Sequence, residues 1–77
     1  MKPTVGRIVI FKQGSAEQPR NGQIEHPAII THVFNDTTVN LQVFFDGGPV
    51  SAATSVPYEN TADPISASWS WPPRVEG

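Results

Sequence analysis

Cysteine is absent from the 77 residues of this sequence, which excludes both a disulfide and a thiolate metal site. Only two histidines are present, His26 and His32, too few for a structural zinc site without additional carboxylate ligands. A domain this short buries only about 60% of the surface that its unfolded chain exposes, so its core is thin. With cross-links and metals excluded, self-association is the remaining source of extra stability, and we expect a homo-oligomer.

Positive charge is also scarce. The formal net charge is −2 at pH 7, and the five lysines and arginines are scattered along the chain. Nucleic-acid binding requires a basic surface and is therefore disfavoured, although folding could still gather Arg7, Lys12 and Arg20 on one face. No run approaches the roughly 20 apolar residues of a membrane span. The first residues also lack the apolar core and cleavage site of a signal peptide, which fits a cytoplasmic protein or a virion component made in the cytoplasm.

Proline and glycine are plentiful, with eight and six copies, and they interrupt every stretch that could carry a helical period. Short β-branched runs between these residues are typical of strands. The spacing predicts an all-β fold, a small five-stranded SH3-like barrel forming one domain over residues 1–77. An incomplete sandwich or an OB-type barrel is the alternative. The expected strands cover residues 5–11, 27–34, 38–45, 50–56 and about 67–71, and an exposed loop with a type I′ turn at Asn21-Gly22 covers about 12–26.

Alternation predicts the direction of many side chains. In run 38–45 it is clean, and the inward residues are Val39, Leu41, Val43 and Phe45. In run 27–34, one face receives Ala28, Ile30, His32 and Phe34. Run 5–11 is apolar on both faces, which predicts burial on both sides or a bend across a barrel corner near Gly6.

No catalytic or metal-binding constellation is recognisable. The sequence lacks a Gly-x-Ser-x-Gly elbow and a phosphate-cradling glycine loop, and the histidines are its only bases with a pKa near neutrality. A metal site would pair a histidine with Glu25 or Asp36, but no known ligand spacing is present. We therefore predict no enzyme, no catalytic residue, no metal and no cofactor.

Aromatic and cationic residues are the best candidates for binding. Trp69 and Trp71 are two apart on a strand and share a face, where they either close the core or a subunit interface, or form a platform beside Arg74. Phe44 neighbours the inward Phe45 and so faces outward, either as a contact surface or under the first loop. The predicted binding residues are Trp69, Trp71, Arg74, Phe44, Arg7 and His26. For Arg7, pairing with Asp36, Asp46 or Glu59 is expected, with anion binding as the alternative.

Several stretches resemble a group of small proteins of tailed bacteriophages and prophages. The matching stretches are Lys2–Val9, Glu25–Ile30, Thr38–Phe44, Thr54–Pro57 and Trp69–Val75. The paired-tryptophan ending, W-x-W-P-x-R-V, is the most distinctive, and Ser70 stands where such sequences often carry a charged residue or histidine. The resemblance implies a phage setting and no particular activity.

Three functions remain open from the sequence. The first is a phage accessory protein that binds a host protein or a small ligand, such as a nucleotide, through its aromatic face in the cytoplasm of the infected bacterium. The second is a virion or assembly component in which the same face is a subunit interface. The third is a nucleic-acid-binding barrel, which suits the fold but not the charge.

Overall fold

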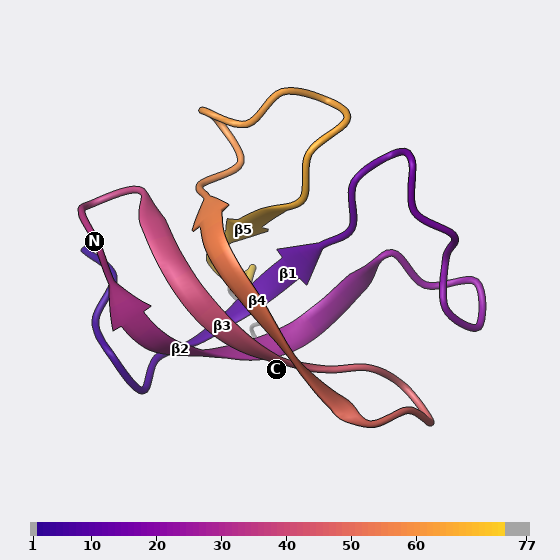
Figure 1. Cartoon of the computed structure of the whole chain (residues 1–77). Helices are drawn as coiled ribbons and strands as arrows, with labels where there is room; N and C mark the ends of the chain where they lie inside the picture. The colour runs from indigo at the N-terminus through magenta and orange to yellow at the C-terminus, as the bar shows by residue number, and fades with distance from the viewer. Residues whose placement is uncertain (1, 74–77) are drawn as a thin grey trace.

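A computed structural model describes residues 2–73 as one curled sheet of five antiparallel strands (Figure 1). The strands are β1 (Ile8–Lys12), β2 (Glu25–Val33), β3 (Thr38–Phe44), β4 (Val50–Pro57) and β5 (Ser68–Ser70). Their order across the sheet is β4-β3-β2-β1-β5, and a parallel bridge between Tyr58 and Trp69 brings the end of β4 to β5. The predicted all-β, SH3-like barrel is confirmed, as a half-barrel closed at one end.

The core lies on the concave side of this sheet, as alternation in β3 predicts. Val39, Leu41 and Val43 are at most 1% exposed, and Phe45 packs against them from just beyond the strand. The other buried apolar residues are Val9, Phe11, Ala28, Ile30, Val56 and Trp69. β1, β2 and β3 therefore contribute alternate residues to a single small core, and β4 and β5 each add one buried apolar residue.

A bulge in β2 overturns part of the expected alternation. The register with β3 shifts between Ile30 and His32, so the side chains beyond the shift change faces. Val33 packs against the core, whereas Phe34 is 53% exposed and packs edge-on against His32 at 4.5 Å between ring centroids. The prediction that His32 and Phe34 share the face of Ile30 was wrong, because alternation alone does not reveal an inserted residue.

The start of β1 also differs from expectation. The chain turns at Gly6 (φ 93°), whose N–H donates to the carbonyl of Ile30, and the ladder proper begins only at Ile8. Ile8 is 62% exposed, so the predicted burial of this run on both sides is wrong for the single chain. Of its two outward apolar side chains, Ile8 is exposed and Ile10 is half-buried.

The first loop contains the hairpin that its Asn-Gly pair predicts. Asn21 and Gly22 both have positive φ (51° and 78°), and Arg20 and Gln23 exchange backbone hydrogen bonds of 2.9 and 2.8 Å. This combination defines a type I′ turn. The hairpin fixes where the Arg20 side chain leaves the loop.

Candidate functional site: the barrel mouth

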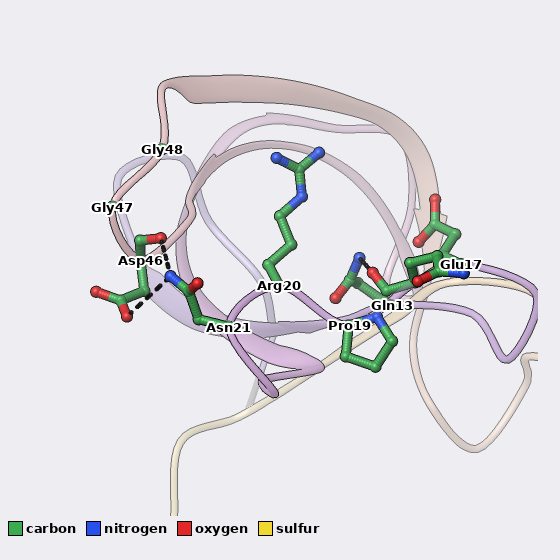
Figure 2. Close-up of a pocket in the computed structure, with 9 residues that line it drawn as sticks. Gln13, Glu17, Pro19, Arg20, Asn21, Asp46, Gly47 and Gly48 are labelled. Carbon is green, nitrogen blue, oxygen red and sulfur yellow. Dashed lines mark hydrogen bonds between the residues drawn. The ribbon is translucent and has the colours of Figure 1, made fainter.

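The open end of the half-barrel carries a depression of about 620 Å³ (Figure 2). We call it the barrel mouth. It lies between the first loop and the β3–β4 turn, and it is lined by Gln13, Glu17, Gln18, Pro19, Arg20, Asn21, Asp46, Gly47 and Gly48. A neighbouring groove of about 340 Å³ runs along β4 and shares Gln13, Glu17 and Arg20 with it. The two hollows thus meet at the same three side chains.

Arg20 projects into the middle of the mouth, between Asp46 on one side and Glu17 on the other (Figure 2). Its guanidinium carbon lies 4.2 Å from the centroid of the Phe45 ring, a cation–π contact that orients the group. Within residues 2–73, no hydrogen bond or ion pair joins this guanidinium to another side chain or carbonyl. Its five N–H donors are therefore available to a ligand.

A buried polar pair, Gln13 and His26, adjoins the mouth, which Gln13 lines. His26 Nε2 and Gln13 Oε1 are 3.0 Å apart, and the Gln13 amide donates to the carbonyl of Gln18 at 3.1 Å. The His26 ring also packs on Phe45 at 4.6 Å between centroids. Burial lowers the pKa of His26, and the charge of Arg20 lowers it further, with Asp46 opposing them. The imidazole is consequently neutral near pH 7 and holds the base of the first loop.

A second contact holds the rim. The Asn21 amide donates to the Asp46 carbonyl at 3.1 Å and approaches its carboxylate at 3.5 Å, linking the first loop to the β3–β4 turn. One guanidinium and two carboxylates, from Glu17 and Asp46, therefore surround the depression. Such a rim can receive an anionic group at the centre and N–H donors at the sides.

The tryptophan pair is not an open platform. Trp69 is 1% exposed, and its indole N–H donates to the carbonyl of Thr37 at 2.9 Å. Its ring packs edge-on against Tyr58 (4.8 Å) and Trp71 (5.2 Å). The prediction that Trp69 contacts a partner is corrected, because β5 turns this side chain into the core. Trp71 remains half-buried at the edge.

The other predicted binding residues do not gather on one surface. Arg7 lies over Trp71, 5.7 Å from the ring centroid, at the end of β1 opposite to the first loop. Phe44 is 40% exposed on the outer side of the sheet, as expected. His26 is 2% exposed, so its prediction as a direct contact is corrected to a supporting one. Arg74 lies outside the described residues.

Sequence reasoning missed the mouth itself. Both of its rims were recognisable as turns, Asn21-Gly22 and Asp46-Gly47-Gly48, but nothing local shows that two turns 25 residues apart meet. The positions of Arg20 and Phe45 gave a weak signal, since each adjoins one of these turns. Their contact depends on the curl of the sheet, which strand spacing does not specify.

Within residues 2–73, no cluster of three or more acidic or histidine side chains could hold a metal ion. The same residues include no helix long and apolar enough to cross a membrane. Fold and site together define a small SH3-like half-barrel with a polar mouth centred on one arginine. Comparison of the chain with protein-family models, curated proteins and solved structures gives no match.

Proposed function

We propose that this protein is a non-enzymatic binding module that takes a small anionic ligand in the barrel mouth. The observation that carries the proposal is Arg20, whose guanidinium is oriented by Phe45 at 4.2 Å and makes no hydrogen bond within the described chain. An arginine held in place in this way loses little rotamer freedom when it binds a planar carboxylate or a phosphate. The volume of about 620 Å³ falls within the ordinary range of ligand sites.

Charge around the mouth narrows the class of ligand. Glu17 and Asp46 flank the guanidinium, so a simple anion would meet repulsion from both sides. A ligand that carries N–H donors beside its anionic group satisfies all three side chains. A nucleotide is such a ligand, with a phosphate for Arg20, an exocyclic amine for a carboxylate and a base that stacks on the guanidinium.

Binding rather than catalysis is supported by the two histidines. His26 is bonded to Gln13 and packed on Phe45, and His32 packs edge-on against Phe34. In the described chain, neither imidazole has a hydrogen bond to a serine or threonine hydroxyl, the contact that nucleophilic catalysis requires. The resemblance to phage proteins supports the proposed setting, an accessory protein in the cytoplasm of the infected bacterium.

The test compares adenosine monophosphate with adenosine in thermal unfolding. Adenosine monophosphate should raise the melting temperature through mass action, and adenosine, which lacks the phosphate, should not. Arg20→Gln should abolish the increase. Arg7→Gln is the matched control, because Arg7 also lies over an aromatic ring but at the other end of β1, and it should retain the increase.

Two results would overturn the proposal. Equal stabilisation of the wild type and Arg20→Gln would place the ligand elsewhere. The absence of any increase at millimolar adenosine monophosphate, N-acetylaspartate and inorganic phosphate would remove the anion-binding role of the mouth. An increase with N-acetylaspartate alone would keep the site but change its ligand class from nucleotide to carboxylate.

A further inference from the structure

Part of the outer side of the sheet is apolar. Ile10 pairs with Pro27, Ile8 pairs with Ile29 and Phe44 pairs with Val50, and the polar Gln42 and Ser70 border these pairs. We call this surface the outer face, and its residues are Ile8, Ile10, Pro27, Ile29, Phe44 and Val50. Their inward neighbours in the same strands fill the core. The face therefore belongs to the sheet itself and not to a loop.

Solvent reaches much of this face. Ile8 is 62% exposed, Val50 is 50% exposed and Phe44 is 40% exposed. Antiparallel sheets with one solvated side normally alternate apolar residues inward with polar residues outward. Contiguous exposed apolar side chains of this kind mark an interaction surface. Run 5–11 has the pattern of a strand covered on both sides, and one chain covers only its inner side.

Opposite charges lie next to each other at one end of the outer face. Lys12 and Glu25 are directly paired across β1 and β2, one row beyond Ile10 and Pro27, and both are exposed. Phe11 precedes Lys12 in β1 and His26 follows Glu25 in β2, and both are buried. Because side chains alternate along a strand, those of Lys12 and Glu25 point outward. An adjacent cation and anion at the boundary of an apolar surface can pair with the same two charges on a second copy.

We propose that two copies of this chain pack outer face to outer face around a two-fold axis that runs along the strands between β1 and β2. This axis exchanges the positions of β1 and β2. Lys12 of each copy then faces Glu25 of the other, Ile10 faces Pro27, and Ile8 faces Ile29. Sheets that pack in this way lie about 10 Å apart, with interdigitated apolar side chains.

A second copy fits this surface better than an unrelated protein does, because the arrangement is self-complementary. The rotation that pairs Lys12 with Glu25 also superposes the apolar rows, so one axis satisfies both. The face carries no other charged side chain in these rows, which leaves no unpaired charge to bury. A chain of 77 residues without cysteine also gains stability from such a partner.

The first test is sedimentation equilibrium across a dilution series. Wild type should dimerise at micromolar concentration. Ile8→Glu should weaken the dimer on the order of 100-fold, because each dimer then buries two unpaired carboxylates. Ile65→Glu is the matched control, with the same substitution at a residue 67% exposed in the β4–β5 loop, and should leave the dimer unchanged. The proposal is overturned if the wild type stays monomeric at about 200 µM, since a dissociation constant above this value is too weak for a functional dimer.

The second test exploits the charges and does not depend on how Ile8→Glu folds. Lys12→Glu and Glu25→Lys should each be monomeric alone, because like charges then face each other across the axis. An equimolar mixture of the two should form a heterodimer, since every facing pair is opposite again. The proposed axis is overturned if the mixture stays monomeric while the wild type dimerises. It is also overturned if either variant forms a dimer on its own. Adenosine monophosphate binding is a separate readout, so the barrel-mouth proposal can fail independently.

Discussion

Replacing Trp69 by phenylalanine should remove one of the contacts that close the barrel. The Thr37 carbonyl accepts hydrogen bonds from both the Trp69 indole (2.9 Å) and the Tyr58 amide (2.8 Å), so it joins the β2–β3 turn to the ends of β4 and β5. Trp69→Phe loses one of these bonds, worth about 0.5–1.5 kcal/mol, while the Tyr58 bond keeps the carbonyl satisfied. The smaller ring also leaves a cavity in the core, which costs about 1–2 kcal/mol more.

The sum of about 1.5–3.5 kcal/mol is large for a domain whose total stability is about 3–5 kcal/mol. Urea unfolding followed by circular dichroism at fixed protein concentration measures this loss. Trp71→Phe is the control, because Trp71 is only half-buried and its indole makes no hydrogen bond within residues 2–73; it should cost less than about 1 kcal/mol. Equal losses of unfolding free energy for the two variants would refute the reasoning and contradict the buried position of Trp69.

Two further predictions concern the first loop. Gly14→Ala should destabilise the protein by about 1–3 kcal/mol, because a Cβ at this position collides with the Ile65 carbonyl oxygen. Gly48→Ala is the control and should cost less than about 0.5 kcal/mol, because a Cβ there meets only ordinary contacts. Similar melting temperatures for the two variants would contradict the packing of the first loop against the β4–β5 loop. Stability should fall as the pH is lowered below 6.5, since the unfolded state then binds a proton at His26 that the folded state, with its lowered pKa, does not. His26→Gln should remove this part of the pH dependence; a thermal unfolding series from pH 7.5 to 5 in which the variant keeps the wild-type dependence would refute the role of His26.

Local patterns in the sequence were enough to predict the strands, the sheet class and most of the core. The alternation in Thr38–Phe44 determined its inward face, and the Asn21-Gly22 pair determined the hairpin in the first loop. Each of these features depends on residues close together in the chain, and backbone sterics enforce them locally. The β2 bulge was missed because an extra residue in one strand appears only when its partner strand is known.

The candidate site was harder to predict than the fold. Paired tryptophans are common in binding surfaces, but the same spacing fits a core, and burial decides between the two. Trp69 has 1% exposure and so belongs to the core. Arg20 carried no motif, and its importance follows from the curvature that brings it over Phe45. The apolar outer side of run 5–11 was visible in the sequence, and the structure shows that Ile8 on this side is exposed, not buried internally.

The most direct test of the barrel-mouth proposal observes the guanidinium itself. In a ¹⁵N-edited NMR titration with adenosine monophosphate, the side-chain Nε–Hε signal of Arg20 should shift with saturation, because its donors bind the phosphate. The corresponding signal of Arg7, which lies over Trp71 at the other end of β1, should stay in place. An Arg20 signal that remains fixed while backbone amides elsewhere move would contradict the account, and binding would then have to be sought outside the mouth.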